Sequence, residues 1–301
     1  MDTMPLVLNK LSKRYPGADT LALDDVSLSV NTGEVYGFLG ANGAGKSTTI
    51  RLLLNFLQPT SGSATIMGLD IVKSSVDVKR HVGYLSGDVA LYPKVTGQEL
   101  LDYLLALQGG ADKKYLGELT KRFEAELDKP IGALSKGNRQ KIGVIQALMH
   151  QPDVLILDEP TSGLDPLMQE VFYEALREAK NKGVAVLMSS HNLDEAQRVC
   201  DRVGIIKHGK LIREQAIGGD ASLSAPMFRV SFRTHDALVA AKREPALRLQ
   251  KQVDSNTLTM QPKGTIAEAL AALSKYDIVS LFSEQTTLED EFIEFYGGKS
   301  L

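Results

Sequence analysis

The sequence predicts an α/β fold, in which a mostly parallel sheet is covered by helices and is followed by a small α+β domain. Short β-rich runs alternate with helical patterns over roughly the first 215 residues, which is typical of a parallel sheet. Two runs, Val154–Leu157 and Val184–Met188, are continuously aliphatic, as expected for strands buried on both faces. The composition changes after Gly218 and Gly219, so we expect a second domain of about 80 residues there.

The first elements can be placed in order. Residues Leu21–Val30 and Glu34–Leu39 are expected to be strands, with a turn between them. Residues Lys46–Leu57 are expected to form a helix, because their apolar residues recur at helical spacing on one face. Pro59 is expected to end this helix, since proline has no backbone N–H.

A helical segment then interrupts the α/β pattern. Helical patterns such as Glu99–Leu107 and Arg139–Met149 dominate residues Thr96–His150. In the second domain, strands are expected at Phe228–Phe232, Thr257–Gln261 and Ile278–Phe282, and helices at Asp236–Arg243 and Ile266–Lys275. A final helix is expected to carry three apolar residues at helical spacing, Leu288, Phe292 and Phe295.

Composition and charge exclude several classes of protein. The chain has 301 residues, 43% hydrophobic and 24% charged, which excludes a disordered or collagen-like chain. With 34 basic and 37 acidic residues, nucleic-acid binding is not expected. The single cysteine, Cys200, excludes an intrachain disulfide and is expected to be buried. No run reaches the roughly 20 apolar residues of a membrane span and no signal peptide is recognised, so we expect a cytoplasmic chain.

A phosphate-binding loop is predicted at residues 40–47. They read GANGAGKS and fit the pattern G-x-x-x-x-G-K-[ST], between a predicted strand and a predicted helix. A loop that wraps a polyphosphate must aim successive backbone N–H groups inward, and glycines permit this path. Lys46 is expected to reach the β- and γ-phosphates and Ser47 to ligate Mg²⁺. The loop alone is equally consistent with a kinase, a GTPase or a motor.

Three further segments narrow the choice. Asp158 ends an aliphatic strand, where a second Mg²⁺ contact is needed, and Glu159 is placed to polarise an attacking water, which implies hydrolysis. Ser135 is expected to cap a helix, so that residues 135–138 form a second anion site. Taken alone, this segment is also consistent with an ordinary capped helix. His191 follows a strand, where a lone histidine is more often an ordinary loop residue.

Together these segments resemble one family. GANGAGKST at 40–48, LSKGN at 134–138, VLILDEP at 154–160, SGLD at 162–165 and His191 occur in the same order in the ATP-binding subunits of ABC transporters. The resemblance covers about residues 4–217. It implies a P-loop NTPase fold of the ABC ATPase type over residues 1–217, with a helical subdomain at about 96–150. Residues 221–301 are then expected to be a small α+β accessory domain.

The resemblance implies roles for the residues in these motifs. Lys46, Glu159 and His191 are the expected catalytic residues, with His191 sensing the γ-phosphate. The expected cofactors are ATP and Mg²⁺, and the expected metal ligands are Ser47 and Asp158.

The resemblance also implies a set of nucleotide-binding residues. Tyr15 resembles the aromatic residue that stacks on adenine, although a tyrosine in the core is the other interpretation. The signature at 134–138 is expected to contact ATP held by the opposite subunit, and the D-loop at 162–165 to lie at the subunit junction. The other expected binding residues are Asn42, Gly43, Ala44, Gly45, Lys46, Ser47, Thr48, Ser135, Gly137 and Asp165.

The sequence departs from the family pattern in two places. The common signature is LSGGQ; here Lys136 and an asparagine replace its third and fifth residues, while Ser135 and Gly137 are retained. We expect function to survive and Lys136 to add charge complementarity. Gly87 stands where the family usually has a glutamine that links Mg²⁺ to the membrane subunit. Asp88 or a water molecule is the expected replacement.

The resemblance also predicts partners. One chain carries one phosphate loop and one signature, so two chains are needed, and a homodimer is expected. The helical subdomain and residues 89–93 resemble regions that contact a membrane subunit. A separate multispanning permease is therefore expected, with the chain at the cytoplasmic face of the cell membrane. The C-terminal segment resembles that of export-type subunits, which favours export of a drug, peptide or lipid-like molecule. Its acidic residues at 289–294 are expected to form a solvated face; a regulatory or dimer contact is the alternative.

Two alternatives stay open. A soluble ABC-type ATPase acting on ribosomes or in DNA repair usually carries two ATPase units or a long coiled-coil insertion, and this chain has one unit and no sustained heptads. A nucleotide kinase or GTPase is disfavoured by the carboxylate pair at 158–159 and by the signature.

Overall fold

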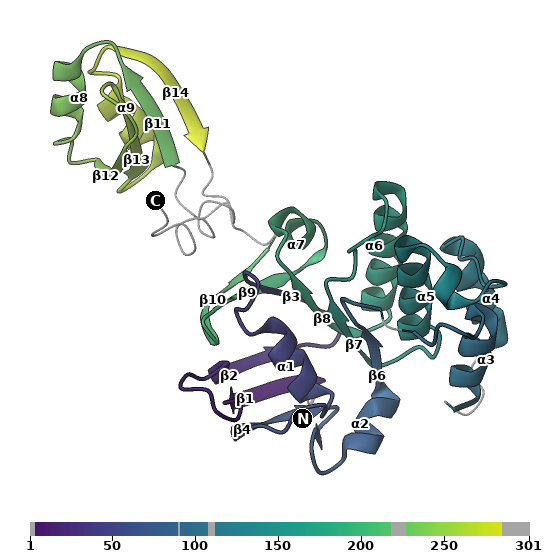
Figure 1. The fold of residues 1–301 in the computed structure, drawn as a ribbon. Helices are drawn as coiled ribbons and strands as arrows, with labels where there is room; N and C mark the ends of the chain where they lie inside the picture. The colour runs from purple at the N-terminus through teal and green to yellow at the C-terminus, as the bar shows by residue number, and fades with distance from the viewer. Residues whose placement is uncertain (1–3, 90, 108–111, 218–226, 285–301) are drawn as a thin grey trace. The chain divides into compact units, whose positions relative to one another are not determined.

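The chain divides into two compact units, Met1–Ile217 and Gly218–Leu301, in a computed structural model that describes residues 4–89, 91–107, 112–217 and 227–284 (Figure 1). The final helix expected around Leu288, Phe292 and Phe295 lies outside the described residues, as does the acidic segment 289–294. Within the described ranges, the structure contains no helix that is both long and apolar enough to cross a membrane.

A six-stranded sheet with the order β10-β9-β3-β8-β7-β6 forms the centre of the first unit (Figure 1). The strands from β9 to β6 pair in parallel, and β10 pairs antiparallel with β9. They are β3 (Val35–Leu39), β6 (Val82–Leu85), β7 (Val154–Asp158), β8 (Ala185–Ser190), β9 (Arg202–Lys207) and β10 (Lys210–Ala216). The expected α/β fold with a mostly parallel sheet is confirmed.

Both faces of this sheet are covered. On β7, Val154 and Ile156 belong to a core that includes residues of α1, whereas Leu155 and Leu157 line a small apolar space together with residues of α5 and α6. A strand buried on both faces explains the continuous aliphatic run. The helices of this unit are α1 (Lys46–Leu53), α2 (Ser75–His81), α3 (Gly97–Leu107), α4 (Lys113–Arg122), α5 (Lys136–Leu148), α6 (Pro166–Asn181) and α7 (Leu193–Val199), with a 3₁₀ turn η1 (Ile131–Ala133).

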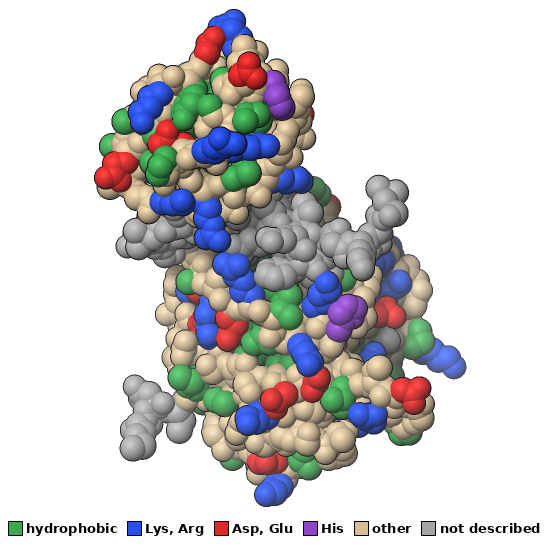
Figure 2. Space-filling view, turned by 90° about the vertical axis from the view of Figure 1, so that its left-hand side faces the viewer, with side chains coloured by type: hydrophobic (Ala, Val, Ile, Leu, Met, Phe, Trp, Pro, Cys, Tyr) green, Lys and Arg blue, Asp and Glu red, His purple; other side chains and the backbone are tan. Residues whose placement is uncertain are grey.

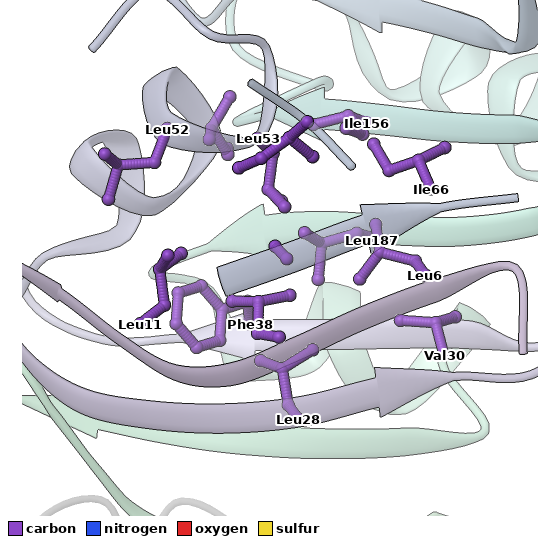
Figure 3. Packing of buried hydrophobic residues seen from close by; sticks show 14 of the residues in the cluster. Leu6, Leu11, Leu28, Val30, Phe38, Leu52, Leu53, Ile66, Ile156 and Leu187 are labelled. Atoms are coloured by element: carbon purple, nitrogen blue, oxygen red, sulfur yellow. The ribbon is translucent and has the colours of Figure 1, made fainter. Parts of the chain in front are cut away.

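A second, antiparallel sheet with the order β2-β1-β4-β5 shares a core with α1 and the central sheet. Its strands are β1 (Leu6–Lys13), β2 (Leu23–Val30), β4 (Ser61–Ile66) and β5 (Leu69–Asp70). Figure 3 shows Leu6 and Leu28 of this sheet close to Phe38 and Leu187 of the central sheet, with Leu53 of α1 nearby. This core fixes β3 and α1, and thereby the two ends of the loop that joins them.

Between β6 and β7 the described chain is helical or irregular. It forms α3, α4, η1 and α5, with one isolated bridge between Thr96 and Pro130. α5 begins at Lys136 because the Ser135 side chain accepts a hydrogen bond from the backbone N–H of Asn138. The expected N-cap at Ser135 is therefore confirmed.

Over its described residues, 227–284, the second unit has the element order β-α-β-β-α-β and one antiparallel sheet, β12-β13-β11-β14. Its elements are β11 (Met227–Phe232), α8 (His235–Ala241), β12 (Leu247–Gln252), β13 (Thr257–Pro262), α9 (Ile266–Leu273) and β14 (Ile278–Glu284). Val230, Leu258 and Leu273 lie in a separate small core. A capping box between Thr265 and Glu268 starts α9.

The predicted end of the first helix was wrong. α1 ends at Leu53, four residues before the expected Leu57. Asn55 adopts a left-handed conformation with φ 56°, and the Phe56 N–H bonds the Arg51 carbonyl. These contacts form a Schellman motif, which satisfies the last helical carbonyls before Pro59 is reached.

The charges on the surface are mixed. On the face in Figure 2, lysine and arginine side chains are interspersed with aspartate and glutamate on both units. This agrees with a chain of 34 basic and 37 acidic residues.

Candidate active site

The loop at residues 40–47 joins β3 to α1. Gly43 and Gly45 have φ angles of 80° and 119°, which disfavour any residue with a side chain. Lys46 is 6% exposed, and its Nζ donates hydrogen bonds to the carbonyl of Gly40 at 2.6 Å and to that of Ala41 at 3.5 Å. The lysine is thus folded back over the loop and holds a positive charge against it.

A cavity of about 500 Å³ opens at this loop. Its walls come from the loop, the start of α1, the end of β6, the end of β7 and the segment after β8. It is lined by these residues: Ala22, Ala41, Asn42, Gly43, Gly45, Lys46, Ser47, Thr48, Ile50, Arg51, Phe56, Tyr84, Ser86, Gly87, Asp88, Asp158, Glu159, Ser162 and His191. The predicted residue Ala44 belongs to the loop but is buried in the hydrophobic core instead.

A hydroxyl and a carboxylate meet at the floor of this cavity. Ser47 Oγ lies 3.1 Å from Asp158 Oδ2, although the two residues are 111 positions apart. Mg²⁺ prefers oxygen ligands and usually binds through one or two protein groups with phosphate oxygens and water, so this pair fits a magnesium ion. In the part of the chain that the structure describes, no cluster of three or more His, Cys, Asp or Glu side chains suits a metal.

Gly87 lies directly beside Asp158. A Cβ atom added at Gly87 would stand 3.1 Å from the Asp158 carbonyl oxygen. Ser86 and Asp88 on either side of it also line the cavity. The sequence position that lacks a side-chain ligand therefore faces the Ser47–Asp158 pair.

Glu159 is held between two basic side chains. Its Oε1 lies 3.4 Å from Lys46 Nζ, and its Oε2 lies 2.7 Å from His191 Nδ1. Its backbone has φ 48°, and its N–H bonds Ser189 of the neighbouring strand. The structure thus brings together the three residues that the sequence proposed as catalytic.

Ser135, Gly137 and Asp165 do not line this cavity. Ser135 and Asp165 cap the N-termini of α5 and α6, where each accepts a backbone N–H three residues on. A Cβ atom on Gly137 would lie 2.9 Å from the carbonyl of Gly163, so the signature packs closely on the D-loop. Lys136 Nζ also donates to Ser162 Oγ at 3.2 Å.

Tyr15 lies just beyond β1 and is half-buried. Its Oη is 3.3 Å from Thr48 Oγ1 on α1. Tyr15 is therefore adjacent to the phosphate loop, but it does not belong to the described lining of the cavity.

Several residues at the site were not found from the sequence. Ser189 Oγ donates to Asp158 Oδ1, and Gln140 Nε2 donates to the Pro160 carbonyl at 2.8 Å. Tyr84 lines the cavity wall, and burial raises its pKa. The sequence signal for Ser189 is the pair of serines at the end of an aliphatic strand. Only the pairing of β7 with β8 places Ser189 beside Asp158.

Comparisons with known proteins point to one family. A family model described as "ABC transporter" matches residues 23–162. The chain is 37% identical over 220 residues to the ABC transporter ATP-binding protein NatA of Bacillus subtilis, covering 70% of this chain and 89% of that protein. It is 30% identical over 308 residues to the bacitracin transport ATP-binding protein BcrA of Bacillus licheniformis, covering 97% of each. A solved ATP-binding subunit of an ABC transporter has a TM-score of 0.66 at 31% identity, covering 71% of this chain and 90% of that chain.

A phosphate loop between a strand and a helix, opening onto this cavity, defines a P-loop nucleotide-binding domain. The chain belongs to the ATP-binding subunits of ABC transporters, and it binds and hydrolyses ATP. The resemblance inferred from the motifs is confirmed.

Proposed function

We propose that this chain hydrolyses ATP as a homodimer and thereby drives export of a drug, peptide or lipid-like molecule through a separate multispanning permease. The observation that carries the proposal is the cavity at the phosphate loop. It brings Lys46, Ser47, Asp158, Glu159 and His191 together from distant parts of the sequence. Such a set matches what phosphoryl transfer to water needs, namely charge stabilisation and an oriented nucleophile.

In this proposal each of these residues has a defined role in hydrolysis. Lys46 and the backbone N–H groups of residues 40–47 bind the β- and γ-phosphates. Glu159 takes a proton from a water molecule while the water oxygen attacks the γ-phosphorus. The bond between the γ-phosphorus and the oxygen that leaves with ADP then breaks. His191 orients Glu159 and senses the γ-phosphate. Tyr15 stacks on adenine.

Mg²⁺ is proposed to bind at Ser47 and Asp158. The ion would supply positive charge to the phosphate oxygens. The hydrogen bond that Asp158 accepts from Ser189 keeps its carboxylate facing Ser47. Asp88, which lines the cavity next to Gly87, is the candidate for a further contact to the metal or its water.

The dimer explains the residues that stand outside the cavity. Ser135 and Gly137 begin α5, where the helix N-terminus favours an anion. They would contact the γ-phosphate held by a second copy of the chain, and Asp165 would lie at the junction. Lys136, which is tied to cavity-lining Ser162, would add positive charge there.

The helical region is the proposed contact with the permease. Tyr92, Tyr103 and Leu107 are 68%, 60% and 67% exposed, which leaves large apolar side chains on its surface. Such exposed apolar groups often mark an interaction site. The match to the bacitracin transport relative spans 97% of this chain and so includes the second unit, which supports export. The chain would then act at the cytoplasmic face of the cell membrane.

Affinity capture of tagged Glu159→Gln from native membranes, with ATP and Mg²⁺, tests this proposal. The protein should carry with it a multispanning protein at about one copy per ATPase chain, because the variant is expected to hold ATP and stay closed. Tyr92→Ala in the same background should reduce that capture without changing ATP binding. Recovery of ribosomal or soluble partners without any membrane protein would overturn the proposal.

A further inference from the structure

A buried carboxylic acid lies behind the Glu159–His191 pair. Glu195, in α7, is 3% exposed, and its Oε2 accepts a hydrogen bond of 2.6 Å from Ser190 Oγ. Its other oxygen, Oε1, is buried and makes no hydrogen bond in the described structure, although the Thr161 hydroxyl lies near enough to the carboxyl group to lower its pKa. Buried polar atoms are nearly always satisfied, so this exception needs an explanation.

Burial raises the pKa of Glu195; the Ser190 and Thr161 hydroxyls oppose this effect, and the charge of Glu159 adds to it. A carboxyl group held out of water costs free energy unless its contacts compensate. An apolar residue would fill the same space at a lower cost. The hydrogen bond between Glu195 and Ser190 therefore points to a role other than packing.

The Ser190 hydroxyl links Glu195 to the residues around His191. It donates to Glu195 and accepts a hydrogen bond of 2.9 Å from the backbone N–H of Asn192. The Asn192 side chain in turn caps α7. His191 lies between Ser190 and Asn192 in sequence, so its backbone is fixed on both sides.

This fixation matters because the imidazole has few restraints of its own. The His191 side chain is 64% exposed, and its hydrogen-bond partner among the described residues is Glu159 Oε2 at 2.7 Å. An exposed side chain loses rotamer freedom when it is held in one geometry. A fixed backbone at His191 lowers this entropic cost, because fewer orientations of the imidazole are accessible before it binds Glu159.

We propose that Glu195 is a positioning residue for ATP hydrolysis: through Ser190 it holds the backbone of His191, so that the imidazole faces Glu159. This inference rests on the roles proposed above for Glu159 and His191. Glu195 touches neither nucleotide nor metal in this arrangement. It acts on turnover and leaves ATP affinity nearly unchanged.

Kinetics of four purified full-length variants test the inference. Glu195→Ala and Ser190→Ala should each lower kcat about 10-fold or more, because small errors in position are costly in catalysis, while the Kd for ATP changes less than about 2-fold. Glu195→Gln keeps an acceptor oxygen and should retain at least about half of kcat. Asp194→Asn is the matched control, since it removes an exposed carboxylate from the same helix.

Combination with His191→Ala separates positioning from general destabilisation. In that background, Glu195→Ala and Ser190→Ala should cost less than about 2-fold, because the residue they position is absent. A merely structural role would lower Tm but would cost the same with or without His191. Ser190→Ala removes a single oxygen atom, so it provides the same test if Glu195→Ala does not fold.

Two further results would overturn the inference, and they differ in meaning. If Glu195→Ala and Ser190→Ala hydrolyse ATP at the wild-type rate while His191→Ala does not, Glu195 has no positioning role. If His191→Ala itself hydrolyses ATP normally, the role proposed for His191 fails, and the inference fails with it.

Discussion

The two carboxylate oxygens of Glu159 have separate partners: Oε2 lies 2.7 Å from His191 Nδ1, and Oε1 lies 3.4 Å from Lys46 Nζ. The carboxylate is therefore held between the phosphate loop and the end of β8. When a γ-phosphate attracts Lys46, Glu159 would be released from that contact and be free to accept a proton. The relationship connects nucleotide binding to the group proposed to activate water.

Lys46→Ala is expected to weaken ATP binding by about 100-fold, since a charged hydrogen-bond partner contributes roughly 1.5–3 kcal/mol. The measurement is equilibrium titration with a fluorescent ATP analogue. Lys114→Ala removes a lysine whose side chain is 85% exposed and should bind ATP normally. Unchanged affinity in Lys46→Ala would refute the assignment of the loop.

Asp158→Asn is expected to raise the Mg²⁺ concentration for half-maximal hydrolysis at least about 10-fold, because a charged oxygen ligand is lost. Binding of ATP in the presence of a chelator should change little. Asp88→Asn provides a comparison at the other side of the cavity and should have a smaller effect. An equal or larger effect from Asp88→Asn would contradict the assignment, because the metal would then depend on Asp88 at least as much as on Asp158.

The stability of the first unit is expected to depend on His150. Burial lowers the pKa of His150 below its usual value of 6.5, although the Val82 carbonyl opposes this. As the pH falls through about 6.5, the unfolded chain takes up a proton there before the folded chain does, so the free energy of unfolding falls. This contribution is complete above the unfolded pKa and is lost toward the lower, folded pKa.

Urea denaturation between about pH 7.5 and 5.5 measures this effect. His150→Gln keeps a donor for the Val82 carbonyl and should show a smaller loss of stability on acidification than the wild type. His208→Asn changes an exposed histidine in the turn between β9 and β10 and should behave like the wild type. Identical pH dependence in all three proteins would contradict the assignment.

Local patterns predicted much of the site. The phosphate loop is encoded in eight consecutive residues, and the strand that ends at Asp158 is recognisable because it is aliphatic throughout. These features depend on short-range sequence. The structure explains their relative placement, because β3, β8 and β7 pair in parallel and so end at one edge of the sheet.

Contacts between distant segments could not be predicted in this way. Ser189 meets Asp158 because β7 and β8 pair with those two residues opposite each other. Glu195 meets Ser190 only after α7 folds back on the end of β8. The end of α1 was missed for a local reason, since Asn55 in a left-handed conformation stops the helix before Pro59 does.

One strand of the second unit was not predicted. Strands β11, β13 and β14 were expected from the sequence, but β12 was not. Its residues after Leu247 are exposed and mostly polar, so it has little hydrophobic signal. Pairing with β13 defines this strand in the structure.

The central claim is that Glu159 activates water for ATP hydrolysis at this site. The most direct test is the steady-state ATPase rate of purified Glu159→Gln, with ATP affinity and mass in solution measured on the same sample. The proposal predicts normal ATP binding, hydrolysis at least about 100-fold slower, and a dimer that accumulates with ATP. Near-normal turnover would contradict the claim and remove Glu159 from the role of general base.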